Sequence, residues 1–225
     1  MNATSGITRA LALKEPYLNR WAMLACGTAA VLSAGLCAFG RVAFNVGAIG
    51  WLTAIIACGV MLAIYGVANE RKEHSLQFVL SLPVSPRQYI RAKTIGMLLA
   101  FLPPWGAAML AAVALVLLSP GVPDGMLPFV CVIGGFLLAN FALVLCGALH
   151  ARSEGLMVGV IIVTNMAVSI FMFVVGALPG IASHMTGPVP VWNDTVAGVL
   201  LAEAVVFVLA LLLPQITAAR RRDLL

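Results

Sequence analysis

Ionisable side chains are scarce in this sequence, and one carboxylate stands apart from the others. Only 9% of the 225 residues are Asp, Glu, Lys or Arg. Glu203 lies roughly 10 Å inside a long apolar run if that run is helical. A carboxylate inside a membrane is costly and usually faces protein or water. Glu203 is therefore a candidate for a polar path or an outer vestibule, and the amides Asn140 and Asn165 are weaker candidates.

The other reactive residue types form no arrangement that supports catalysis or metal binding. The three histidines, His74, His150 and His184, are scattered, and no HExxH run of a zinc protease is present. All five cysteines lie in apolar runs without a CxxC pair, as small buried hydrophobic residues do. The methionines, which with cysteine could hold a soft metal such as copper, have no recognisable ligand spacing. We predict no catalytic residue and no metal site.

The most polar stretch is Glu70 to Lys93, with the sequence ERKEHSLQFVLSLPVSPRQYIRAK. Leu76, Val79 and Leu80 repeat at helical spacing after a charged start, which predicts an amphipathic helix over residues 70–82. Pro83 ends this helix, and Ser85-Pro86 starts a second one. On composition alone, the segment fits either a docking surface for a protein or a helix lying on anionic lipid.

Six apolar runs surround this segment, each long enough to cross a hydrocarbon core of about 30 Å. The predicted spans are residues 21–40, 47–69, 94–119, 126–149, 155–178 and 196–219. Helices are expected because each backbone polar group must be paired inside lipid. Mean hydropathy is +1.07, and no stretch has the composition of a second, soluble domain. We predict an all-α polytopic membrane protein with a single domain over residues 1–225.

Basic residues set the predicted orientation. Twelve of the thirteen fall on one side of the six spans, and Arg41 falls on the other. The positive-inside rule places both termini and residues 70–93 in the cytoplasm. The outer connections are predicted at residues 41–46, 120–125 and 179–195, and the last is expected to be partly buried. Because the basic residues flank apolar runs, we expect lipid and not nucleic acid as their partner.

The cytoplasmic segment resembles the first cytoplasmic loop of the type-2 ABC-transporter permease family. The matching positions are Glu70, Arg71, Ser75, Leu76, Leu80, Ser81, Leu82, Pro83, Val84, Ser85, Arg87 and Lys93. His74 departs from the pattern, where glycine is common. The six-span layout and the basic N-terminal stretch extend the resemblance to the whole chain. The stretch from Ile7 to Arg20 is similar to the family's interfacial lead-in helix.

The resemblance implies the membrane half of an ATP-driven exporter in a bacterial inner membrane. A separate ATPase would bind ATP and Mg²⁺, since this sequence has no GxxxxGK[ST] phosphate loop. Residues 70–82 would be the coupling helix that contacts the ATPase. The implied coupling residues are Glu70, Arg71, Glu73, Ser75, Leu76, Val79, Leu80, Pro83 and Arg87, with a second contact at His150, Arg152 and Glu154.

The family also pairs two six-span halves, which implies a homodimer or a pair of related chains with two ATPase copies. Several alternatives stay open. The haem-exporter permease of cytochrome c maturation has a similar size and span count. An intramembrane enzyme belongs to another class, but the sequence has no recognisable catalytic motif for it. A stand-alone scaffold or channel does not account for the coupling-like segment. The sequence does not indicate the transported substrate.

Overall fold

The structure, a computed structural model, describes residues 3–68, 85–151 and 153–218, and these residues form helices joined by turns and by one longer connection at residues 183–193. The predicted all-α fold is confirmed. The elements are α1 (Ala3–Leu18), α2 (Arg20–Leu36), α3 (Arg41–Ala63), the π-helical turn η1 (Ile64–Ala68), α6 (Pro86–Leu118), the 3₁₀ turn η2 (Asp124–Met126), α7 (Leu127–His150), α8 (Glu154–Ala177), α9 (Pro179–Ala182) and α10 (Asp194–Ala218).

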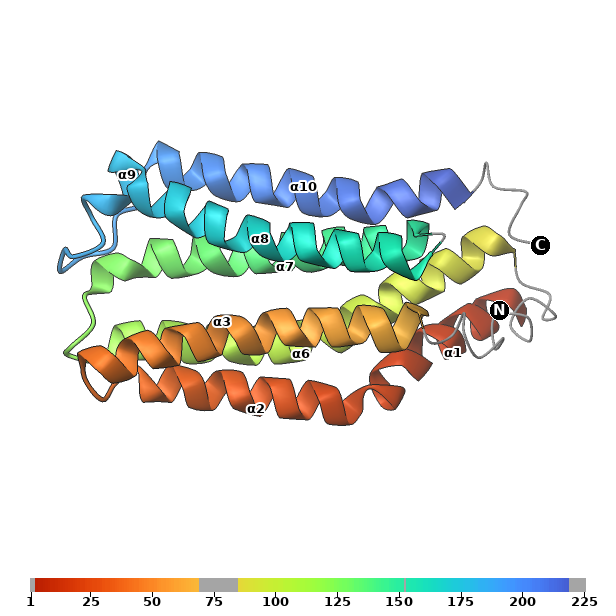
Figure 1. Cartoon of the computed structure of the whole chain (residues 1–225), viewed down its shortest axis with the longest axis horizontal. Coiled ribbons are helices and arrows are strands. Elements are labelled where there is room, and N and C mark those ends of the chain that lie inside the picture. Colours follow the sequence, from red (N-terminus) through yellow and green to blue (C-terminus); the bar gives the residue numbers. More distant parts are fainter. Residues whose placement is uncertain (1–2, 69–84, 152, 219–225) are drawn as a thin grey trace.

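The long helices run side by side in two groups, with α2, α3 and α6 on one side and α7, α8 and α10 on the other (Figure 1). Within the described residues, α3, α6, α7, α8 and α10 are long and apolar enough to cross a membrane. The sixth apolar helix, α2, has 17 residues, the lower limit for a crossing. It ends at Leu36, four residues before the predicted end of that span.

The start of α3 corrects one boundary from the sequence. Residues 41–46, predicted as an outer turn, form the first turns of α3. The chain reverses before them, because Gly40 adopts a φ of 98°, a conformation that suits a residue without a side chain. Helix α3 can therefore begin directly at Arg41. The other predicted spans agree with α6, α7, α8 and α10 to within a few residues, except that α6 starts earlier.

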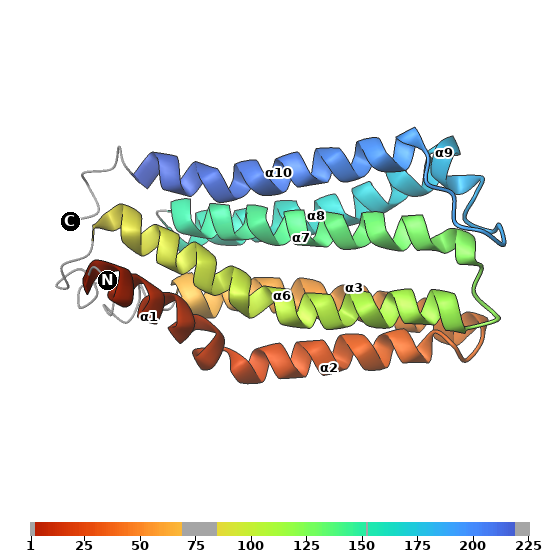
Figure 2. The same ribbon diagram turned by 180° about the vertical axis from the view of Figure 1, so that it is seen from behind.

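Helix α6 is the longest element, with 33 residues from Pro86 to Leu118. Ser85 caps it: its hydroxyl accepts a bond from the Gln88 backbone N–H, and the Gln88 side chain accepts one from the Ser85 N–H. The predicted second helix start at Ser85-Pro86 is thus confirmed, and it continues into the span without a break. Figure 2 shows that α6 is bent along its length, and Pro103 and Pro104 inside the helix account for the bend.

The two groups of helices meet in an apolar core. The rings of Phe101 on α6 and Phe141 on α7 stack with centroids 4.0 Å apart. Two tryptophans bridge helices through their indole N–H groups: Trp51 donates to the Ala108 carbonyl at 2.9 Å, and Trp105 donates to the Gly134 carbonyl at 3.0 Å. Because a buried indole needs an acceptor, these bonds fix the spacing of α3, α6 and α7.

The long outer connection folds back onto the end of the bundle. Ile181 on α9 is buried, whereas Val189 and Trp192 are exposed. The backbone N–H of Gly125 donates to the Gly187 carbonyl at 3.0 Å, and any side chain at residue 125 would collide with this loop. Ile181 thus packs within the protein and the loop closes over the start of α7, while burial of residues 179–195 in the outer leaflet stays a prediction.

Candidate functional site

The two ends of the bundle differ in charge. One end, called here the basic end, holds α1, η1, the start of α6, the turn between α7 and α8, and the end of α10 (Figure 1). The other, called here the loop end, holds α9 and the starts of α3, α7 and α10. All basic residues of the described helices except Arg41 lie toward the basic end, on α1, the start of α2 and the start of α6.

Most of the predicted coupling residues fall between η1 and α6. Glu70, Arg71, Glu73, Ser75, Leu76, Val79, Leu80 and Pro83 lie within residues 69–84, and Arg152 lies at another gap, all outside the described residues. The flanks of the first segment are described: η1 ends at Ala68, and the capped start of α6 follows at Pro86. Arg87 is exposed in the first turn of α6, where it is free to meet a partner.

A buried ion pair joins α1 to α6 just inside this start. The ammonium of Lys93 donates to a carboxylate oxygen of Glu15 at 2.7 Å, and each residue is only 3% exposed. Lys93 lies about 38 Å from Leu118 along α6, beyond the ~30 Å of a hydrocarbon core. The pair therefore lies near the membrane surface at the basic end.

Glycines let α1 approach α6 at the ion pair. A Cβ at Gly96 would lie 2.7 Å from the Ala12 carbonyl oxygen and 2.7 Å from Cγ of Glu15. Gly66 of η1 also lies beside the Glu15 carboxylate. A Cβ added at Gly66 would lie 3.5 Å from Oε2 of Glu15. Helix α1 thus packs through Ala12 and Glu15, while Leu18 is exposed. Contact of its exposed side with lipid stays a prediction.

This joint is the functional feature that sequence reasoning missed. Lys93 appeared only as part of the motif, and Glu15 was not considered. A buried charge is costly without its partner, so removal of either residue leaves a strongly unfavourable group behind. The available signal was the combination of a lone acidic residue in the N-terminal helix with a lysine at the start of a span. That signal identifies two candidate residues, but it does not predict that they contact each other.

The turn between α7 and α8 holds the predicted second contact. The Nε2 atom of His150 lies 2.7 Å from the Thr217 hydroxyl of α10, and its Nδ1 atom lies 2.8 Å from the Cys146 carbonyl. His150 therefore ties α7 to the end of α10. Glu154 is exposed at the start of α8, where Ser153 caps the helix. Contact of either residue with a cytoplasmic partner stays a prediction.

Glu203 is buried between α10 and α7. It is 7% exposed, and neither carboxylate oxygen has a hydrogen-bond partner among the described residues. The carboxylate lies directly over Gly135, where a Cβ would collide with Oε2. Gly135 therefore provides the space for this side chain. Glu203 therefore differs from Glu15, because no cation among the described residues meets it in this interface.

The three predicted path residues do not converge. Asn140 lies on the face of α7 toward α3 and α6, beside a cavity of about 10 Å³ that also touches Ile55 and Phe101. Asn165 on α8 donates to the Ile161 carbonyl at 2.8 Å. The side-chain oxygens of both asparagines have no partner within the described ranges. Glu203 lies between α7 and α10, so it and Asn140 occupy different helix interfaces.

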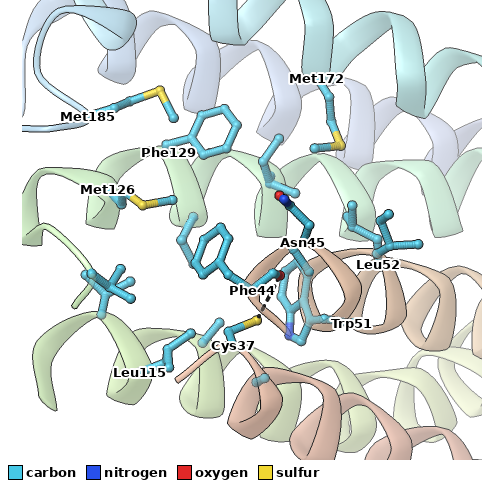
Figure 3. Close-up of a pocket in the computed structure, with 18 residues that line it drawn as sticks. Cys37, Phe44, Asn45, Trp51, Leu52, Leu115, Met126, Phe129, Met172 and Met185 are labelled. Atoms are coloured by element: carbon cyan, nitrogen blue, oxygen red, sulfur yellow. Dashed lines mark hydrogen bonds between the residues drawn. The ribbon is translucent and has the colours of Figure 1, made fainter. Parts of the chain in front are cut away.

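A larger cavity lies at the loop end and was not predicted. This outer chamber has a volume of about 480 Å³ and lies among α2, α3, α6, α7, the end of α8 and the loop after α9 (Figure 3). Its lining is almost entirely apolar: Ala34, Cys37, Phe44, Asn45, Ala48, Ile49, Trp51, Leu52, Ala112, Leu115, Val116, Val122, Met126, Phe129, Val130, Ile133, Met172 and Met185. Because six segments contribute, no local sequence pattern could have located it.

Comparison with known families gives a direct result. The family model described as ABC-2 family transporter protein matches residues 38–196. The chain belongs to the ABC-2 transporter family. Among curated proteins, none matches it.

As an ABC-2 family member, the chain is a multi-pass permease subunit of an ABC transporter, which associates with an ABC ATPase subunit. The match includes Lys93, the predicted coupling segment and the lining of the outer chamber except Ala34 and Cys37. It does not include Glu15 or Glu203. The two buried carboxylates of this ABC-2 protein thus lie outside the matched region.

Proposed function

We propose that this permease exports its substrate, driven by ATP hydrolysis in a separate ATPase that docks at the basic end. The ATPase holds ATP and Mg²⁺, and residues 70–82 form the coupling helix that it contacts. Glu70, Arg71 and Glu73 supply polar contacts, while Glu154 contributes from the neighbouring turn. The family match supports this proposal, because it covers the whole coupling segment.

The observation that carries the proposal is the construction of α6. A helix of 33 residues is about 50 Å long, roughly 20 Å more than the hydrocarbon core requires. Its capped start follows the coupling segment directly, and its other end reaches the outer chamber through Leu115 and Val116. A displacement of the coupling segment is thereby carried along one continuous helix to the opposite side of the membrane.

The Glu15–Lys93 pair adds a second element to this movement. Since α1 is joined to α6 by a buried ion pair at 2.7 Å, the two helices shift together at the basic end. We further propose that two permease copies, identical or related, assemble with two ATPase copies in a bacterial inner membrane. One permease has six apolar helices, which are few for a closed path.

The proposal is tested by purifying the tagged chain from membranes of its native host. We expect an ABC ATPase to accompany it, and the captured complex to hydrolyse ATP. Glu70→Ala with Glu73→Ala should lower the captured ATPase or its activity by at least about tenfold if they dock in a charge-assisted contact. Asp194→Asn, a change of an exposed acid at the loop end, is the matched control and should leave both unchanged.

Two results would overturn the proposal. One is the absence of any ATPase from the preparation while the permease itself remains folded. The other is equal loss of ATPase with Asp194→Asn and with the Glu70/Glu73 variant, because the loss would then not be specific to the basic end.

A further inference from the structure

We propose that the outer chamber binds a single-chain anionic amphiphile, such as a long-chain carboxylate. Its acyl chain occupies the chamber, and its head group lies beside Arg41. The inference rests on the proposed function only in treating this ligand as cargo; the binding site itself is argued from the cavity. It assigns a ligand class to the permease.

The size and lining of the chamber suit one flexible hydrocarbon chain. Its volume of about 480 Å³ lies within the ~300–1,000 Å³ typical of small-molecule sites. Met126, Met172 and Met185 reach it from separate positions around the wall (Figure 3). Because methionine is unbranched and polarizable, these side chains adapt to ligands of varied shape. Helices from both groups line the space, which is partly open to the surface, so a chain can enter it.

The walls of the chamber are held in place independently of any ligand. Trp51 is fixed by its bond to the Ala108 carbonyl, and Cys37 lies 3.5 Å from the Phe44 carbonyl. Met185 belongs to the loop that Gly125 anchors through Gly187. The cavity is therefore a built feature of the folded chain and not a gap between loosely placed side chains.

A second cavity, which includes Arg41, adjoins the apolar chamber. It has a volume of about 360 Å³ and shares Cys37, Phe44, Val122 and Met126 with the chamber, so the two are neighbours. This second cavity is lined by Arg41. In the described part of the chain, no carboxylate lies within ion-pair distance of Arg41. An apolar cavity that leads to an unpaired guanidinium matches a ligand with a hydrocarbon tail and an anionic head.

The position of the positive charge favours an anionic head group over a cationic or neutral one. Arg41 is the sole basic residue that the sequence places on the outer side. A cationic head group would be repelled there, and a neutral head would gain no ion pair. Binding should therefore depend on head-group charge through Arg41 and on chain volume through the chamber wall.

The test is photolabelling of the purified full chain, without ATPase, in phosphatidylcholine nanodiscs. The probe is palmitate with a diazirine near the chain end. We expect saturable labelling of residues 41–52 and 122–133, displaced by unlabelled palmitate and not by monopalmitoylglycerol at the same concentration. Arg41→Gln should raise the half-labelling concentration about fivefold, the scale of an exposed ion pair, and Arg41→Lys should restore it.

Chain volume is tested with a matched pair of substitutions. Ala48→Phe fills the chamber and should abolish labelling, whereas Ala204→Phe, on the exposed side of α10, should leave it unchanged. Labelling that never saturates, or that spreads equally over the exposed faces of α8 and α10, overturns the site. Full displacement by phosphatidylglycerol overturns the single-chain ligand, because the occupant would then be bilayer lipid.

The assignment of this ligand as cargo is tested separately, in the captured ATPase complex. Palmitate should change the ATP hydrolysis rate of the unmodified complex and leave that of Ala48→Phe unchanged. An unchanged rate in the unmodified complex, despite saturable labelling, overturns the cargo assignment alone. Failure to capture an ATPase overturns the proposed function, while the labelling result stands by itself.

Discussion

Glu15 and Glu203 both have buried side chains, but they lie in different parts of the bundle and have different surroundings. Glu15 at the basic end meets Lys93 at 2.7 Å, and the pair joins two helices. Glu203, between α7 and α10, has no partner among the described residues. A paired buried charge links the elements that carry it, whereas a buried carboxyl group without a partner weakens its interface.

This difference suggests that the two ends of the bundle have different roles. The basic end joins α1 to α6 through a buried ion pair, as the proposed transfer of force from an ATPase requires. The outer half contains the chamber and Glu203, which has no partner among the described residues, so we expect its interfaces to rearrange more easily. Four substitutions test this contrast through the free energy of unfolding, measured in mixed micelles of detergent and SDS.

The largest effect is expected from Lys93→Met. Removal of one partner leaves the Glu15 carboxylate buried without the lysine, which should lower the free energy of unfolding by about 3–5 kcal/mol. The double variant Glu15→Met/Lys93→Met should be more stable than Lys93→Met, since no charge is left behind. Arg91→Met, two residues away and exposed, is the control and should change stability by less than about 0.5 kcal/mol.

Glu203→Met should change the free energy of unfolding in the opposite direction. Methionine needs no hydrogen-bond partner, so the free energy of unfolding should rise by about 1–3 kcal/mol. Glu15→Met, the same change at the paired carboxylate, should lower it. If both substitutions destabilise the protein to the same degree, the two carboxylates are equivalent and the contrast is wrong.

The close approach of α1 to α6 is tested by Gly96→Ala. The added methyl would meet the Ala12 carbonyl oxygen at 2.7 Å, and we expect a loss of about 1–3 kcal/mol from overpacking. Gly106→Ala lies on the same helix with open space around it, so the helix preference for alanine should raise stability by about 0.5–1 kcal/mol. Equal effects at both positions would contradict the packing.

The smallest effect is expected where His150 meets Thr217. Thr217→Val removes the hydroxyl 2.7 Å from Nε2, and interhelical hydrogen bonds in membrane proteins average about 0.6 kcal/mol. Thr28→Val removes a hydroxyl that bonds only within its own helix, and it serves as the control. A loss above that of Lys93→Met would make this contact, and not the ion pair, the main joint of the basic end.

The sequence predicted the helices well because each apolar run is long and flanked by charge or turn residues. It misplaced the start of α3, since Asn45 and Gly47 resemble turn residues, whereas the reversal is completed at Gly40. The capped start of α6 was predictable because Ser85, Pro86 and Gln88 are a local pattern.

The sites were less predictable because they depend on contacts between distant residues. Glu15 and Lys93 are separated by 78 positions, and hydropathy says nothing about which helix faces which. The outer chamber needs six segments to enclose it. Glu203 was identified from its isolation in an apolar run, but its missing partner and its contact with Gly135 required the fold.

The most direct test of the central claim is site-specific photocrosslinking in native membranes. A crosslinking amino acid at Leu76, in the predicted coupling helix, should capture an ABC ATPase. The same amino acid at Val189, exposed at the loop end, should not. A crosslink to the ATPase from Val189, or none from Leu76 in a folded and active complex, would contradict ATP-driven coupling through the basic end.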